Sequence, residues 1–82
     1  MNQAEIYRNA VKCVCLANRI MEDTEGHPID MVSAAVALSA IGDYKSNRTI
    51  VGEFAPMEVL ALCDRRIKLA EDYFDSRFEE AI

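Results

Sequence analysis

The sequence predicts an all-α protein, folded as a small helical bundle with three main helices. Its 82 residues include three Gly and two Pro, too few for the frequent turns of a many-stranded sheet. Two long stretches repeat apolar residues at three- and four-residue spacing, and a third stretch between them is apolar nearly all round. Because a chain of this length buries only about 60% of its unfolded surface, residues 1–82 are expected to form one domain.

The first helix is expected over residues 3–22. Its opposite face carries a basic stripe formed by Arg8, Lys12 and Arg19, and we interpret this stripe as a solvated surface. Acidic residues, Gly26 and Pro28 then interrupt the pattern and end the helix. The apolar face of this helix is formed by Ile6, Tyr7, Ala10, Val11, Cys13, Val14, Ala17, Ile20 and Met21, with Cys15 and Leu16 outside it.

The second helix is expected over residues 30–41, in a segment whose only charge is Asp30. Asp30 is predicted to be the N-cap and to accept from the backbone N–H of Val32 or Ser33, and Gly42 to end the helix in the left-handed conformation. Large residues alternate around this helix with two troughs of Ala and Ser. We therefore expect it to be buried on nearly all sides, by the other helices or by a second copy of the chain.

Residues 43–55 are expected to form a short helix or an ordered loop. Ile50, Val51 and Phe54 have helical spacing and Ser46 could cap such a helix, whereas residues 49–51 form a β-branched cluster that would favour a strand. A helix-turn-helix DNA binder is a third interpretation, in which Lys45 and Arg48 would contact DNA. The acidic net charge and Gly52 oppose it.

The last helix is expected over residues 56–81, with Pro56 at its first position. A second, narrower apolar line on its flank comprises Leu62, Leu69 and Tyr73, which would face either the second helix or another copy of the chain. Asp64 with Lys68 and Lys68 with Asp72 have the spacing of helical ion pairs. The main apolar stripe is Val59, Leu60, Cys63, Ile67, Ala70, Phe74, Phe78 and Ala81.

Charge is distributed unevenly between the two ends of the chain. Residues 1–21 carry three basic side chains against one acidic one, a side-chain charge of +2, whereas residues 71–82 carry one against five, or −4. The acidic end could bind a cationic partner or pack against the basic stripe. Its acidic face comprises Glu71, Asp72, Asp75, Glu79 and Glu80.

The sequence indicates no catalytic site, metal site or cofactor. His27 is the only histidine, and Cys13 and Cys15 are two residues apart on a helix, where their side chains point away from each other. Glu22 with Glu25 and Asp72 with Asp75 share the spacing of acidic pairs in all-α metal-dependent phosphohydrolases but not the required helix order. We interpret these pairs as solvated charges.

The expected function is protein binding in the cytoplasm. No secretory leader and no apolar run of membrane-spanning length are found, and three cysteines are an odd number for a disulfide framework. A net charge of −5 argues against a general nucleic-acid binder, because neutralising phosphates needs a cationic surface. Two hypotheses remain open: a homodimeric adaptor or regulator without catalytic activity, and an acidic inhibitor whose last helix occupies a basic cleft of another protein.

Overall fold

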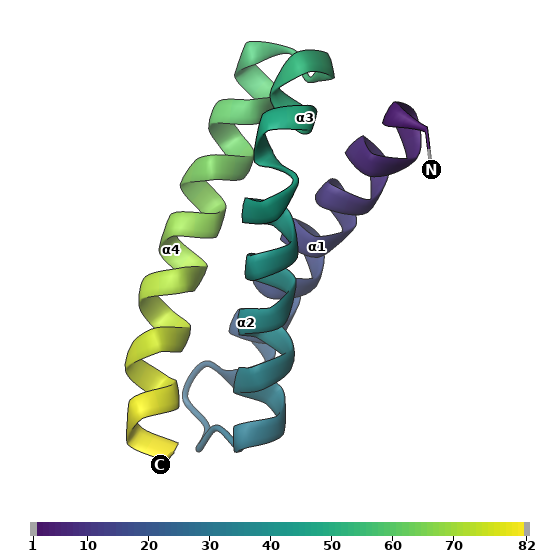
Figure 1. The fold of residues 1–82 in the computed structure, drawn as a ribbon. Coiled ribbons are helices and arrows are strands. Elements are labelled where there is room, and N and C mark those ends of the chain that lie inside the picture. Colours follow the sequence, from purple (N-terminus) through teal and green to yellow (C-terminus); the bar gives the residue numbers. More distant parts are fainter. Residues whose placement is uncertain (1, 82) are drawn as a thin grey trace.

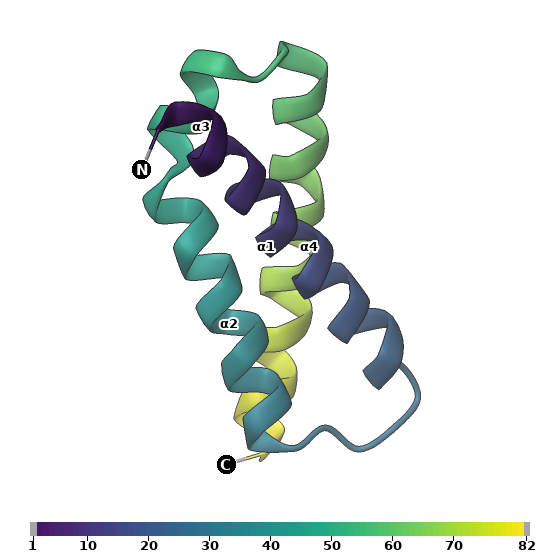
Figure 2. The same ribbon diagram turned by 90° about the vertical axis from the view of Figure 1, so that its right-hand side faces the viewer.

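The computed structural model describes residues 2–81 and confirms the all-α bundle. Four helices follow one another: α1 (Gln3–Thr24), α2 (Met31–Ser46), α3 (Arg48–Phe54) and α4 (Met57–Ala81). The three long helices pack against one another, and α3 lies at the end of the bundle where α1 begins (Figure 1). Figure 2 shows α1 crossing α4 obliquely, so that the two helices diverge on either side of their contact. No helix in the described part of the chain is long and apolar enough to cross a membrane.

Small residues form the centre of the core. Ala17 of α1, Ala37 of α2 and Ala70 of α4 have no exposed surface, which lets the three helix backbones approach closely. Around these alanines lie larger buried side chains, of which Tyr44 and Phe74 are the largest. The core therefore combines alanine contacts at the centre with aromatic and aliphatic side chains around them.

Helix α1 extends two residues beyond its predicted end. The Asn2 side chain accepts from the backbone N–H of Glu5 (2.9 Å) at the beginning, and the Thr24 hydroxyl donates to the carbonyl of Ile20 (2.9 Å) at the end. Gly26 then adopts a φ of 78°, which glycine accepts without steric cost. Glu22 and Asp23 therefore lie within the last helical turn, Glu25 is the C-cap, and the turn at Gly26 follows.

Helix α2 begins as predicted but does not end as predicted. The Asp30 carboxylate accepts from the backbone N–H of Ser33 (2.6 Å), and this hydrogen bond lowers the pKa of Asp30. The predicted end at Gly42 is wrong, because the helix continues to Ser46 without a positive φ at Gly42. The reason is Tyr44, which is 2% exposed and continues the buried face by one more turn, so its burial offsets the helix-breaking tendency of glycine.

Gly42→Ala is expected to raise the free energy of unfolding by about 0.5 to 1 kcal/mol, because alanine is the better residue inside a helix. A Cβ at this position would meet no heavy atom within 4 Å. Urea unfolding of dilute protein, followed by circular dichroism, measures the change. A loss of stability would indicate that Gly42 ends the helix after all.

Within one chain, α2 is buried on one face only, so the other helices do not provide the burial expected on nearly all sides. Its buried residues are Ala34, Ala37, Ala40, Ile41 and Tyr44, which lie on one face. On the opposite face Val32 is 74% exposed and Val36 is 44% exposed. Because α1 and α4 cover a single face, the other apolar face of α2 is left open to solvent.

The segment between α2 and α4 contains the short helix α3, which confirms the first of the alternatives for residues 43–55. Val51 is buried and anchors α3 to the core, so the β-branched residues 49–51 lie in a helix rather than in a strand. Ser46 does not cap α3, since it is the last residue of α2 and Asn47 lies between the two helices. Helix α4 begins one residue after Pro56, whose carbonyl accepts from the backbone N–H of Leu60 (3.0 Å).

Candidate functional site

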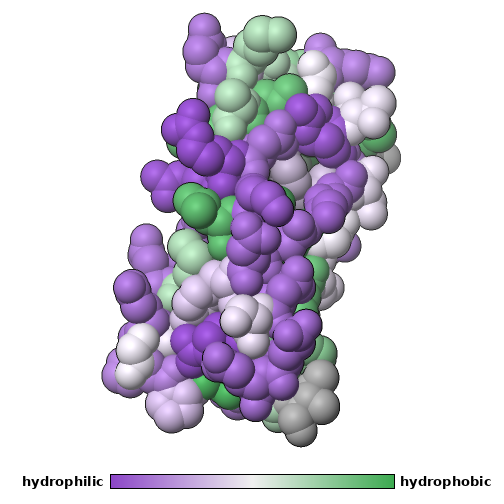
Figure 3. Space-filling view, turned by 90° about the vertical axis from the view of Figure 1, so that its left-hand side faces the viewer, coloured by the Kyte–Doolittle hydropathy of each residue, from purple (hydrophilic) through white to green (hydrophobic). Residues whose placement is uncertain are grey.

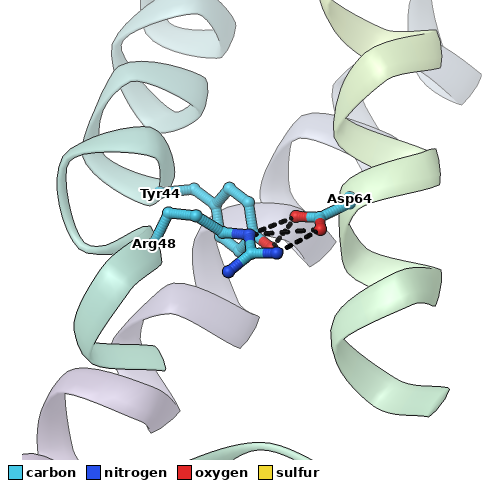
Figure 4. Close-up of polar contacts among 3 residues, drawn as sticks. All are labelled: Tyr44, Arg48 and Asp64. Atoms are coloured by element: carbon cyan, nitrogen blue, oxygen red, sulfur yellow. Dashed lines mark hydrogen bonds and ion pairs between the residues drawn. The ribbon is translucent and has the colours of Figure 1, made fainter. Parts of the chain in front are cut away.

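A polar cluster joins α2, α3 and α4 at one end of the bundle (Figure 4). The Tyr44 hydroxyl donates to Asp64 Oδ1 (2.6 Å). The Arg48 guanidinium donates to the same carboxylate from Nε (2.8 Å to Oδ1) and from Nη2 (2.8 Å to Oδ2), which is a bidentate ion pair. Gly52 leaves room for this arrangement, because a Cβ there would lie 2.9 Å from Arg48 Nη1.

The electrostatics of the cluster keep each group in its ordinary ionisation state. Hydrogen bonds from Arg48 lower the pKa of Asp64, with a further contribution from the Tyr44 hydroxyl. Burial, followed by the hydrogen bond to Asp64, raises the pKa of Tyr44. Tyr44 therefore keeps its proton as a hydrogen-bond donor, and the cluster is suited to clamping three helices together rather than to proton transfer near neutral pH.

Asp64→Asn is expected to lower the free energy of unfolding at pH 7 by about 1 kcal/mol, because a partly exposed ion pair becomes a neutral contact. Since the pKa of Asp64 is lower in the folded state, its stabilising contribution is complete above the ordinary carboxyl pKa of about 3.9 and is lost as the pH falls below it. The difference between the variant and the wild type should therefore shrink in acid.

The matched control is Asp72→Asn, which neutralises a carboxylate in an exposed ion pair with Lys68 (3.2 Å). That pair should contribute less than about 0.5 kcal/mol. Urea unfolding of both variants between acidic and neutral pH provides the comparison. Equal effects of the two substitutions at neutral pH would contradict the clamping role of Asp64.

The sequence reasoning missed this cluster because it paired Asp64 with Lys68 and ended α2 before Tyr44. Tyr44 follows Ile41 at three-residue spacing, so a pattern search continued past Gly42 could have found it. The cluster also includes Arg48, one of the two basic residues that the helix-turn-helix interpretation would place on DNA. Arg48 is paired with Asp64, and Lys45 donates to Glu71 (2.6 Å), so both side chains have partners within the chain.

The predicted acidic face is partly used within the fold. Glu71 pairs with Lys45 (2.6 Å), Asp72 with Lys68 (3.2 Å) and Glu80 with Arg77 (3.4 Å). Only two of its five predicted members, Asp75 and Glu79, are exposed without an ion pair in the described part of the chain. The charge available to an external partner is therefore smaller than the sequence indicated.

The predicted self-association line on α4 is divided by the structure. Leu69 is 58% exposed on the outer surface, and Leu62 is 46% exposed and lines a groove beside α1. Tyr73 is half-buried against the core, and its hydroxyl lies 3.0 Å from Thr24 Oγ1 and accepts from Arg77 Nη1 (2.7 Å). The face in Figure 3, on the α4 side of the bundle, is mostly hydrophilic, and its hydrophobic areas are small and separate.

Arg77 extends this hydrogen-bond network to the loop between α1 and α2. Its guanidinium lies over the Tyr73 ring, 5.4 Å from the centroid, and donates from Nη2 to the backbone carbonyl of His27. The network attaches the loop and the end of α1 to α4. Tyr73 and Arg77 thus have internal partners, which the sequence pattern did not indicate because these partners lie about 50 residues away.

The uncovered side of α2 is an apolar surface that extends along the helix. Its residues Val32, Ala35, Val36 and Ser39 are all exposed, and no charge interrupts the face between Asp30 and Asp43. A groove of about 380 Å³ runs along this face toward α1, with Asp43 at its charged end, and its other lining residues are Cys13, Leu16, Ala35, Val36, Ser39 and Ala40. We call Val32, Ala35, Val36 and Ser39 the α2 face.

A second and larger groove lies between α1 and α4, with a volume of about 430 Å³. Val11, Val14 and Leu62 contribute apolar surface, and Arg19 and Arg66 line it from opposite helices. Arg8, Lys12 and Arg19, the predicted basic stripe, are exposed on α1, and only Arg19 lines this groove. We call this feature the α1–α4 groove.

The cysteines and His27 are dispersed. Cys63 is buried, Cys13 half-buried and Cys15 exposed, all as free thiols, and burial raises the pKa of both Cys13 and Cys63. Within residues 2–81, no three His, Cys, Asp or Glu side chains are grouped so that they could hold a metal ion. Comparison with family models, curated proteins and solved structures finds no match for this chain.

Proposed function

We propose that this protein is a small interaction module that pairs with a second copy of itself through the α2 face. The observation that supports this most directly is the exposure of an apolar helix face that carries no charged side chain. Exposed apolar surface of this kind typically marks a protein contact. As a dimer, the protein would present two copies of its remaining surface, as an adaptor or regulator does.

Charge favours the α2 face over the other two long helices. On α1, Lys12 and Arg19 flank exposed Leu16, so two copies meeting across α1 would place like charges opposite each other. On α4, exposed Leu69 follows exposed Lys68. The α2 face has neither problem, because its side chains are aliphatic or carry only the Ser39 hydroxyl.

The shape of the α2 face also suits self-pairing. A symmetric dimer brings the same patch together from both copies, so the patch must be complementary to itself. Ala35 and Ser39 are small and allow two helices to approach closely, while Val32 and Val36 provide the side chains that fill the space between them. Leu16 of α1 lines the adjoining groove and lies at the edge of this surface.

The alternative of an acidic inhibitor has less support. Three of its five acidic residues are held in ion pairs within the chain, which leaves Asp75 and Glu79 for an external partner. An exposed pair of carboxylates contributes little to affinity unless a desolvated anchor accompanies it. We therefore assign the proposed role to the α2 face, as binding without a catalytic step.

Val36→Glu is expected to weaken self-association at least about tenfold, because an unpaired carboxylate buried in an apolar contact costs several kcal/mol. Sedimentation velocity over a dilution series measures the effect. The matched control is Leu69→Glu, which places the same side chain at another exposed aliphatic position and should leave the association unchanged. Circular dichroism checks that both variants stay folded.

Two results would contradict the proposal. One is a wild-type protein that remains monomeric at the highest concentration reached. The other is a reversed pattern, in which Leu69→Glu abolishes association and Val36→Glu does not, since this would place the contact on α4.

A further inference from the structure

We infer that the α1–α4 groove binds an acidic amphipathic helix from a partner protein. This inference concerns a different surface from the α2 face and does not depend on self-pairing. It rests on the shape of the groove, on its apolar surface, and on the distribution of cations that have no partner inside the chain.

The groove is elongated and mostly apolar. Its α1 residues extend from Tyr7 to Glu22, a distance of about 22 Å along the helix at 1.5 Å per residue. Its apolar lining includes Val11, Val14, Val59 and Leu62. The Leu62 side chain is 46% exposed, so its apolar surface is open to a partner. The groove follows α1 for about four helical turns, with an apolar lining from Tyr7 to Cys15 and polar residues toward Glu22, which matches an amphipathic helix better than a compact small molecule.

The cations that form no ion pair within the described chain all lie on the two helices that border this groove. Of the nine Lys and Arg residues, Lys45, Arg48, Lys68 and Arg77 form ion pairs within the described chain. No ion pair is found there for the other five, and all of them lie on α1 or on the first half of α4. These five residues are Arg8, Lys12, Arg19, Arg65 and Arg66.

Two of these cations are part of the groove itself. Arg19 lines it from α1 and Arg66 lines it from α4, so positive charge stands on both sides of the apolar surface. Glu22 lies at one end and is its only acidic residue. In a protein with a net charge of −5, this arrangement selects a partner segment that is acidic on its flanks and apolar at its centre.

Two other occupants fit less well. A second copy of the same groove would bring Arg19 and Arg66 against each other as like charges. A nucleic acid strand would gain the two arginines but would place its phosphates beside aliphatic side chains in an otherwise acidic protein, where few contacts neutralise them. An amphipathic helix instead places apolar residues at positions i, i+4 and i+7 in the groove and glutamates beside the arginines.

The test uses a fluorescently labelled peptide of about 16 residues, with leucines at i, i+4, i+7 and i+11 and glutamate and alanine elsewhere, about as long as the groove. Fluorescence anisotropy is measured with the full-length protein. Arg66→Glu should weaken binding about tenfold by replacing an attraction with a repulsion, and Leu62→Asp should weaken it similarly by removing apolar contact. Circular dichroism verifies that the variants are folded.

The matched control is Arg65→Glu, which makes the same change at the neighbouring residue that does not line the groove. It should weaken binding less than about threefold, through long-range charge alone. Val36→Glu, on the α2 face, should leave peptide binding unchanged, which separates this inference from the proposed self-pairing. A peptide with lysine in place of glutamate should not bind.

Several outcomes would overturn the inference. One is an absence of binding at peptide concentrations up to about 1 mM. Another is an equal loss of binding for Arg65→Glu and Arg66→Glu. Equal binding of a peptide with the same composition but scrambled leucine spacing, or tighter binding of a single-stranded oligonucleotide, would show that the groove selects negative charge alone.

Discussion

Phe74→Ala is expected to lower the free energy of unfolding by about 3 to 5 kcal/mol, because it removes a fully buried aromatic ring from a core that cannot close around the gap. The Phe74 ring also packs edge-on against Tyr73, with their centroids 4.9 Å apart, and Tyr73 connects α4 to the end of α1. A domain of this length has a total stability of about 4 to 12 kcal/mol. The substitution should therefore consume a large part of it.

Urea unfolding and thermal melting of the variant measure this loss. Phe54→Ala is the matched control, because Phe54 is the same residue type at the end of α3 and is about half exposed. It should cost less than about half as much, in proportion to the smaller area that it buries. If both substitutions destabilised the protein equally, Phe74 would not be the core residue that its burial indicates.

Ala70→Leu is expected to lower the free energy of unfolding by about 1 to 3 kcal/mol, for the opposite reason. Ala70 has no exposed surface and lies where α4 meets the other long helices, at the level of the alanine contacts. A larger side chain there must either leave its preferred rotamer or push the helices apart. Adding apolar volume at position 70 should therefore destabilise the protein, although burial of apolar side chains stabilises it elsewhere in the core.

Ala61→Leu tests whether the effect comes from packing. Ala61 is an exposed alanine of the same helix, so the same substitution meets no neighbouring helix. Its stability should stay within about 0.5 kcal/mol of the wild type, as for most surface changes. Chemical denaturation of the two variants provides the comparison, and a tolerated leucine at position 70 would contradict the close approach of the helices.

Local sequence signals predicted the helices and several of their boundaries. The apolar spacing of α1 and α4 defined their buried faces, and Asp30 defined the start of α2, because these signals act between residues three or four positions apart. Gly42 misled the prediction of the end of α2. Its local tendency to end a helix was overridden by burial of Tyr44, whose contact with Asp64 lies 20 residues away and has no local signature.

The candidate surfaces were only partly predictable for the same reason. The sequence identified α2 as apolar on all sides and left open whether a second copy covers it, but one-sided coverage by α1 and α4 became visible only in the structure. Tyr73 was assigned to a surface line because its spacing matched Leu62 and Leu69. Its partner Thr24 comes from the crossing of α1 and α4, which spacing along one helix cannot reveal, whereas Arg77 lies four residues further along α4.

The most direct test of self-pairing through the α2 face is an isotope-filtered nuclear Overhauser experiment on a mixture of labelled and unlabelled protein. The α2 face predicts contacts between copies at the methyl groups of Val32, Ala35 and Val36, with Leu16 at the edge. These contacts should disappear in Val36→Glu and persist in Leu69→Glu. Contacts between copies at Leu62 and Leu69 instead, or none at concentrations where the protein sediments as a dimer, would contradict the proposal.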